Sequence, residues 1–133
     1  MPYMLDTCIC VAYLRGRNEG LLQKLRSYEP SLIKIPAIVM AELMYGAYKS
    51  RRVEDNLREI EEFAADFEII PFDNLEAQAY GQIRTALERK GQVIGYHDML
   101  IAATALTCRA VLVTNNTREF SRIDGLLLDD WTI

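Results

Sequence analysis

Asp98 stands where a carboxylate is costly unless something binds it. It precedes eight consecutive apolar or small residues in the stretch GYHDMLIAATAL. If this stretch is a helix, the residues on the same face are Ile101, Ala102 and Ala105. A solvated helix cap does not require such a face, and an unpaired buried charge is expensive. We therefore interpret Asp98 as part of a binding or catalytic site, with capping of the helix that follows IGYH as a role that it can combine with this one.

Two further carboxylates invite the same interpretation. Glu42 lies in AIVMAELMYGAY, where its helical neighbours three positions away are Val39 and Tyr45. A glutamate on an apolar or small-residue face needs a cation or strong hydrogen bonds. Asp6 directly follows the apolar segment YML, where a carboxylate can cap the next helix or face a ligand. The two roles are not exclusive.

The segment VTNNTREF supplies the fourth candidate acid. Asn116 and Glu119 stand three positions apart, which is the spacing of a capping box. Asp73 and Glu76 have the same spacing, and there nothing else suggests chemistry, so we predict capping alone. Capping and a site role both remain open for Glu119.

Few reaction classes suit these four candidate acids. Carboxylates that converge on one crevice repel each other unless protons or metal ions neutralise them. Ligand sets made only of oxygen suit Mg²⁺, with Mn²⁺ as a substitute, rather than zinc. His97 is the only histidine, which excludes a ribonuclease mechanism based on two histidines. Because phosphate-binding glycine motifs are also missing, metal-assisted phosphodiester hydrolysis is the reaction class that remains.

The elements that position these residues alternate between short strands and helices. Apolar, β-branched runs predict strands over 3–6, 32–36, 67–72, 110–114 and 126–128. Apolar periodicity and capping signals predict helices over 8–14, 19–28, 37–50, 53–66, 74–90 and 98–108, with Gly91 as a stop signal. This alternation indicates an α/β protein with a parallel sheet, whose ligands bind at the carboxyl ends of the strands. Asp129 and Asp130 are expected in an exposed tail.

Length and composition are those of one domain spanning residues 1–133. The chain has 133 residues and a formal net charge of −4, which by itself does not indicate nucleic-acid binding. No apolar run approaches the length of a membrane span, and the first residues lack the pattern of a signal peptide, so we expect a cytoplasmic location and no membrane partner. The three cysteines form no disulfide or zinc pattern, which favours reduced thiols.

Four segments together resemble the PIN-domain proteins of the VapC toxin type: MLDTCIC, AELMYGA, GYHDMLIAATAL and LVTNNTREFSRIDGL. The resemblance covers nearly the whole chain in the family's order. It implies a three-layer α/β/α domain with a central parallel sheet. It also implies a Mg²⁺-dependent endoribonuclease toxin that forms a homodimer and is inhibited by a VapB-type antitoxin. Its RNA substrate would be tRNA, and the TNNTREF variant resembles the branch that cleaves initiator tRNA.

The resemblance assigns roles to individual residues. Asp6 and Asp98 would hold the metal ion, with Glu42 ligating it through water or orienting the attacking water. The remaining acidic position would fall on Asn116 or Glu119, and the supporting hydrogen bonds on Thr7 and Thr114. Two residues depart from the family pattern: Cys8 stands where an asparagine is frequent, and Asn116 where an aspartate is expected.

Basic and aromatic residues are candidates for holding RNA. The positions predicted as RNA contacts are Arg15, Arg17, Lys49, Arg51, Arg52 and Tyr96, with Arg84, Arg89 and Lys90 as further backbone contacts. Taken singly, each charge is explained equally well by an ordinary solvated surface. The alternative function is a catalytically inactive PIN-like module that binds RNA or protein.

Overall fold

The computed structural model describes all 133 residues and contains a sheet of five parallel strands. Its strand order is β3-β2-β1-β4-β5. The central strand β1 (Tyr3–Leu5) pairs with β2 (Ile33–Pro36) and β4 (Val111–Val113), and the edges are β3 (Glu68–Ile70) and β5 (Leu128–Asp129). The predicted parallel sheet is therefore confirmed.

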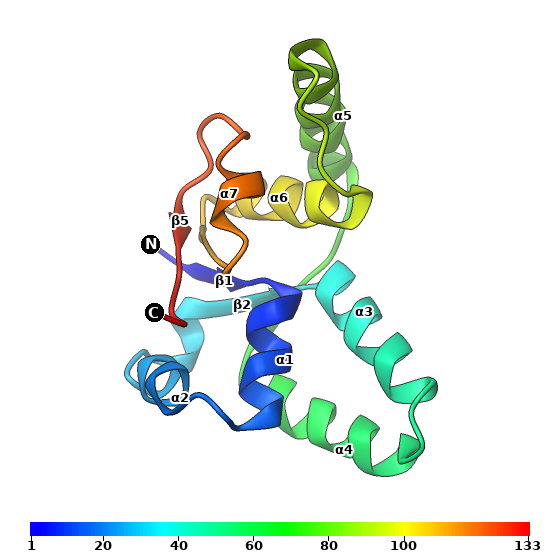
Figure 1. The fold of residues 1–133 in the computed structure, drawn as a ribbon, viewed down its shortest axis with the longest axis vertical. Coiled ribbons are helices and arrows are strands. Elements are labelled where there is room, and N and C mark those ends of the chain that lie inside the picture. Colours follow the sequence, from blue (N-terminus) through cyan, green and yellow to red (C-terminus); the bar gives the residue numbers. More distant parts are fainter.

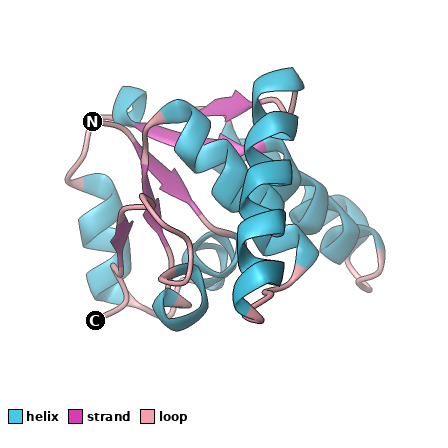
Figure 2. Ribbon diagram, turned by 90° about the horizontal axis from the view of Figure 1, so that it is seen from above, coloured by secondary structure: helices cyan, strands magenta, loops and turns pink.

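Helices cover both faces of this sheet, which gives the expected three layers (Figures 1 and 2). They are α1 (Thr7–Arg15), α2 (Glu19–Arg26), α3 (Ala37–Tyr48), α4 (Val53–Ala64), α5 (Asn74–Lys90), α6 (Tyr96–Cys108) and the short α7 (Thr117–Phe120), with a 3₁₀ turn at Pro30–Leu32. None of these helices is long and apolar enough to cross a lipid bilayer.

The register of the strands aligns their carboxyl ends. Leu5 is paired with Val113, so the next residues, Asp6 and Thr114, leave the sheet side by side. The Asp6 amide still donates to the Val113 carbonyl at 3.0 Å, which continues the ladder one residue beyond the strand. The sheet thus presents polar side chains at the edge where ligands bind in parallel α/β proteins.

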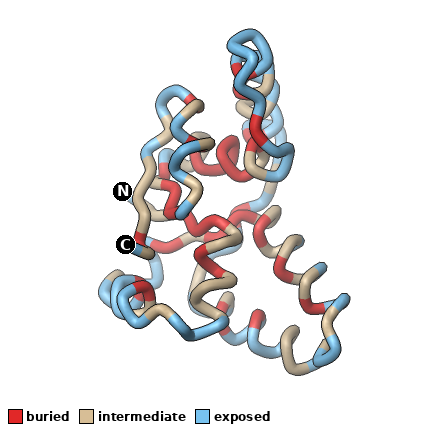
Figure 3. The backbone as a smooth tube through the Cα atoms, viewed as in Figure 1, coloured by how far each residue is buried: buried red, intermediate tan, exposed pale blue.

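Helix α6 is the most deeply buried helix and explains the apolar run after Asp98. Six of its thirteen residues are buried, and the predicted inner face of Ile101, Ala102 and Ala105 is fully inaccessible. The helix packs against α5, α3, β2 and β4, so it needs apolar side chains on more than one face (Figure 3). Ala102 and Ala105 allow this close packing because they are small.

Helix α5 begins and ends as the sequence predicts. Asp73 and Glu76 form a complete capping box, in which the Asp73 amide donates to Glu76 Oε1 at 2.8 Å. Gly91 ends the helix with a φ of +66°, a left-handed conformation that costs glycine little. Capping is thus a sufficient explanation for this pair of acids.

The expectation of an exposed C-terminal tail is wrong. Asp129 belongs to β5 and pairs with Val113, and Trp131 is only 3% exposed. The Trp131 ring stacks on Tyr28 at a centroid distance of 5.0 Å and contacts Tyr3 at 5.2 Å. Burial of these aromatic surfaces draws the chain end back onto the sheet, because a large ring gains more from packing than a short polar tail loses in freedom.

Candidate active site

Asp6 combines a capping role with a central place at the strand edge. It is the N-cap of α1, and its Oδ1 accepts a hydrogen bond from the Thr7 amide at 2.8 Å. Its Oδ2 accepts the hydroxyl of Thr114 at 2.7 Å and the thiol of Cys8 at 3.4 Å. Asp6 is 5% exposed, so these three donors compensate for the solvation that its carboxylate loses.

Glu42 reaches the same edge from α3. The Thr7 hydroxyl donates to Glu42 Oε1 at 3.1 Å and so links α3 to the first turn of α1. Its predicted apolar face is only partly buried, because Val39 is inaccessible whereas Tyr45 is 67% exposed. Glu42 therefore lies at the margin between the core and solvent, where a carboxylate can meet a ligand.

Asp98 lies in the first turn of α6 without acting as its cap. The N-cap is Gly95, and no side-chain hydrogen bond caps this helix. Burial, followed in decreasing order by the negative charges of Asp6, Glu119 and Glu42, raises the pKa of Asp98 from 3.8 to about 6, while His97 opposes the shift. The other three candidate acids are therefore close enough to Asp98 to affect it, although they come from three other segments of the chain.

Asn116 and Glu119 form a pair, but not the capping box that their spacing suggests. The Asn116 side chain makes no capping bond at the start of α7, and its Nδ2 instead donates to Glu119 Oε2 at 3.1 Å. The backbone amide of Asn116 donates to the Thr114 hydroxyl at 3.0 Å, and that hydroxyl in turn donates to Asp6. A continuous chain of hydrogen bonds thus connects Glu119 with Asp6.

Cys8 belongs to this network, which sequence reasoning did not foresee for a cysteine. Its Sγ lies 3.4 Å from Asp6 Oδ2 and 3.7 Å from Thr114 Oγ1. Burial and the charge of Asp6 raise the pKa of the Cys8 thiol to about 11, so the thiol keeps its proton at neutral pH and can donate it. It thereby replaces the amide donor that an asparagine would supply. All three cysteines are free, as expected.

The candidate metal ligands are of the chemical type that binds a hard divalent cation. Every candidate ligand is a carboxylate or amide oxygen, which is the ligand type that Mg²⁺ prefers. Three donors occupy about three of the four acceptor positions of the Asp6 carboxylate, which leaves one position on Oδ1. No three acidic, histidine or cysteine side chains stand in an arrangement that would hold a metal ion without moving. Binding would therefore require the carboxylates to turn toward the ion.

The residues predicted to contact RNA are exposed, except for Arg84, which is half-buried. Arg15 and Lys49 line a groove of about 400 Å³ between α1, α3 and α4, and Glu42 lines it too. Tyr96 is 60% exposed at the first position of α6, so it is not a core residue. Arg17 and Arg51 are exposed in the connections between α1 and α2 and between α3 and α4.

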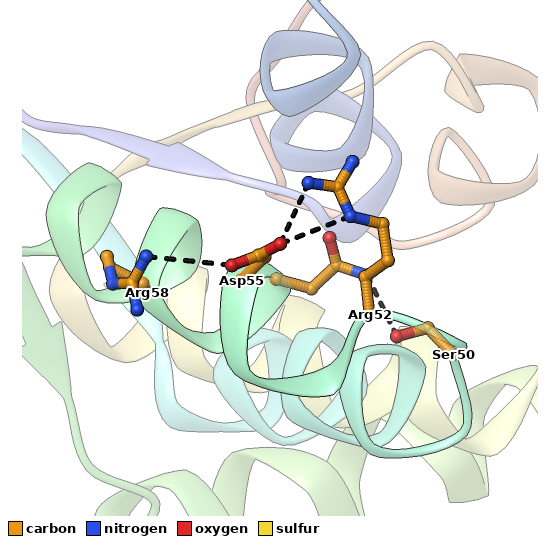
Figure 4. A network of polar contacts seen from close by, with 5 residues as sticks. Ser50, Arg52, Asp55 and Arg58 are labelled. Carbon is orange, nitrogen blue, oxygen red and sulfur yellow. Dashed lines mark hydrogen bonds and ion pairs between the residues drawn. The ribbon is translucent and has the colours of Figure 1, made fainter.

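Arg52 is a predicted contact whose charge is already partnered by an acid. Its Nη2 donates to Asp55 Oδ2 at 2.8 Å and its Nε at 3.2 Å to the same oxygen (Figure 4). Asp55 also faces Arg58, with Nη1 at 3.6 Å from Oδ1. Because Arg52 is 76% exposed this ion pair is weak, yet it turns the guanidinium toward α4.

Comparison with known proteins agrees with this geometry. The PIN domain family model matches residues 3–126. Ribonuclease VapC2 of Rickettsia felis is 42% identical over 132 residues, which is 98% of each chain. The tRNA(fMet)-specific endonuclease VapC of Shigella flexneri is 36% identical over 132 residues, which is 99% of each chain.

A solved structure is similarly close. A chain in the crystal structure of VapBC2 from Rickettsia felis, bound to a DNA fragment from their promoter, has a TM-score of 0.93 at 41% identity. The match covers 98% of this chain and 99% of that one. This chain therefore belongs to the PIN-domain family, and within that family to the VapC group.

Proposed function

We propose that this protein is a Mg²⁺-dependent endoribonuclease and the toxin of a type II toxin–antitoxin pair. The observation that carries the proposal is that the negative charges of Asp6, Glu119 and Glu42 all reach Asp98 and raise its pKa. Like charges at close range are unfavourable in the absence of a counter-ion, which supports a cation-binding role. Relatives that match nearly the whole chain are named as a ribonuclease and as a tRNA(fMet)-specific endonuclease.

The contacts of each residue suggest its role in the proposed reaction. Mg²⁺, when bound, lowers the pKa of a bound water and stabilises negative charge on the phosphate. Asp6 and Asp98 are the residues that hold the ion, and Thr114 and Cys8 fix the Asp6 carboxylate. Glu42, oriented by the Thr7 hydroxyl, positions the attacking water. Hydrolysis by water leaves a 5′-phosphate and a 3′-hydroxyl.

Glu119 and Asn116 complete the outer part of the site together. The hydrogen bond between their side chains holds Glu119 within electrostatic range of Asp98. The missing aspartate at position 116 is thus compensated by an acid three residues further along. This pair orients water around the ion or adds a second, weaker ion site.

The proposed substrate is tRNA, and initiator tRNA in the first instance. The relative from Shigella flexneri that supports this choice is named for tRNA(fMet). The proposed partners are a VapB-type antitoxin and a second copy of the chain. For the antitoxin we propose the groove between α1, α3 and α4, because Val11, Leu14 and Leu43 line it and it opens beside Glu42.

The test is cleavage of total tRNA by purified, antitoxin-free protein in Mg²⁺. The expected result is a small set of products with 5′-phosphates, which EDTA abolishes and Asp98→Asn reduces to background. Asp73→Asn is the matched control, because Asp73 is also an acid after a strand but serves only as a helix cap. Mapping the product ends tests the initiator-tRNA assignment, and adding the product of an adjacent antitoxin gene tests inhibition.

The inactive binding module is the second candidate, because no three ligands are arranged to hold an ion without movement. Folded protein that cleaves nothing in Mg²⁺ or Mn²⁺, and whose melting temperature neither ion raises, would favour this alternative. A rise in melting temperature with Mg²⁺ that Asp98→Asn removes would count against it.

A further inference from the structure

Two exposed tyrosines stand within one helical turn of the candidate acids. Tyr45 follows Glu42 by three residues on α3, and Tyr96 precedes Asp98 by two residues on α6. Their exposed fractions are 67% and 60%, so both rings are accessible to solvent. The two helices that carry these tyrosines, α3 and α6, are in contact with each other.

Each of these rings carries a cation. Lys49 Nζ lies 4.7 Å from the centre of the Tyr45 ring, and the Arg84 guanidinium carbon lies 4.7 Å from the centre of the Tyr96 ring. Arg84 is held in place by the Tyr80 hydroxyl at 3.1 Å and by Glu88 at 3.4 Å. Both pairs therefore combine an exposed aromatic ring with a positive charge.

The other exposed or cation-bearing tyrosines lack this combination. Tyr28 also has a lysine near its ring, Lys24 at 5.7 Å, but its face is stacked on Trp131. Tyr48 is 65% exposed on the same helix as Tyr45, yet no cation lies over its ring. Only the two tyrosines beside the acids have both an accessible ring and a cation.

The negatively charged backbone of an RNA is repelled by the negative charge of this site. The chain carries a formal net charge of −4, and the charges of Asp6, Glu119 and Glu42 all reach Asp98. Lys49 supplies positive charge two helical turns after Glu42 at the end of α3, and Arg84 of α5 supplies it over the ring of Tyr96. An aromatic ring next to each cation offers a face on which a base can stack, and such stacking contributes regardless of base identity.

We propose that the Tyr45–Lys49 and Tyr96–Arg84 pairs are two stacking clamps that hold unpaired nucleotides on the two sides of the phosphate to be cut. This inference rests on the proposed ribonuclease function and adds a substrate requirement to it. Bases in a duplex are stacked on both faces and cannot lie on these rings, so the RNA must be single-stranded around the cut.

The first test is binding of a short, fluorescein-labelled single-stranded RNA of mixed sequence to the full chain. All proteins carry Asp98→Asn to prevent cleavage. Tyr45→Leu and Tyr96→Leu should each weaken binding roughly five- to one-hundred-fold, the loss expected for one stacked base. Tyr45→Phe and Tyr96→Phe should bind almost as well as tyrosine, because the ring is kept. Tyr48→Leu is the matched control and should change nothing.

A second test distinguishes stacking from general attraction. An RNA of the same length built from abasic nucleotides should bind the protein that keeps both tyrosines more weakly than the RNA with bases does. With this abasic RNA, Tyr45→Leu and Tyr96→Leu should cause little further loss of binding. Equal binding by the leucine and tyrosine proteins would overturn the clamps, and so would an equal loss in Tyr48→Leu. Unchanged RNA binding with lost antitoxin binding would also overturn them, in favour of a protein contact.

An RNA cleavage assay distinguishes failure of the clamps from failure of the proposed ribonuclease function. A protein with unsubstituted residues that cuts no RNA in Mg²⁺ or Mn²⁺ would overturn the proposed function. Cleavage that is equally fast in Tyr45→Leu, Tyr96→Leu and the unsubstituted protein would overturn the clamps alone. Because both side chains are exposed, the leucine variants should keep the melting temperature of the parent.

Discussion

Thr114 donates its hydroxyl to Asp6 at 2.7 Å, a buried hydrogen bond between residues that are 108 positions apart in the chain. The bond joins the ends of the two central strands and fixes the carboxylate that lies deepest in the candidate site. The same hydroxyl accepts the Asn116 amide, so one oxygen connects Asp6 to the segment that carries Glu119.

Thr114→Val should therefore reduce both stability and activity. The change preserves shape but leaves Asp6 and the Asn116 amide with one partner fewer, which costs about 1–3 kcal/mol in the free energy of unfolding. Thr107→Val is the control, because its hydroxyl donates only to a carbonyl within α6. Urea denaturation measures the difference, and equal losses in the two variants would contradict the role of Thr114.

The pKa of Asp98 predicts a pH dependence of stability. Its value of about 6 in the folded protein lies above the ordinary 3.8, so the folded state binds the proton more tightly than the unfolded state. The stabilisation is complete below the ordinary value and is lost as the pH rises through about 6. Without divalent cations, the melting temperature should fall over this window in the parent and less in Asp98→Asn. Parallel curves would refute the prediction.

Removal of the Glu119 charge should lower the pKa of Asp98. Glu119 is one of the negative charges that raise this pKa, so Glu119→Gln should move the titration of Asp98 toward 3.8. Nuclear magnetic resonance of the Asp98 carboxyl carbon against pH measures the shift. Glu61→Gln, on the exposed face of α4, is the control and should leave the Asp98 titration in place.

Cys8 should act as a hydrogen-bond donor rather than as a nucleophile. Its raised pKa of about 11 keeps the thiol protonated beside Asp6. Cys8→Ser should retain most of the RNA cleavage, whereas Cys8→Val should lose severalfold because Asp6 loses a donor. Cys108→Ser, at the other end of α6 from Asp98, tests for a general effect of removing a thiol. Full activity in Cys8→Val would show that the donor is dispensable.

Trp131 should contribute strongly to stability although it lies near the C-terminus. Its ring is 3% exposed between Tyr28 and Tyr3, and truncation of such a side chain costs about 3–5 kcal/mol. Trp131→Ala should therefore lower the midpoint of denaturation, with Trp131→Phe in between. Ile133→Ala is the control, since that side chain is fully exposed. A midpoint unchanged by Trp131→Ala would mean that the tail contributes nothing.

Sequence alone identified the architecture because its signals are local. Alternating apolar strands and amphipathic helices required a covered parallel sheet, and the end of β1 beside Asp6 followed from the same rule. The capping box of Asp73 and Glu76 and the stop at Gly91 also depend only on neighbouring residues. The acids on apolar faces were visible because burial of a carboxylate without a partner is costly.

Tertiary structure alone decided which groups meet. The spacing of Asn116 and Glu119 suggested a cap, whereas the fold turned the amide toward Glu119 and the backbone toward Thr114. The polar DDW segment suggested a solvated tail, whereas the Trp131 ring packs against two aromatic rings, those of Tyr3 and Tyr28, from distant segments. These contacts depend on residues brought together from far along the chain, and local pattern carries no information about such partners. The sequence thus determined the acids and their elements, and packing determined their hydrogen-bond partners, their pKa values and the exposure of the tyrosines beside them.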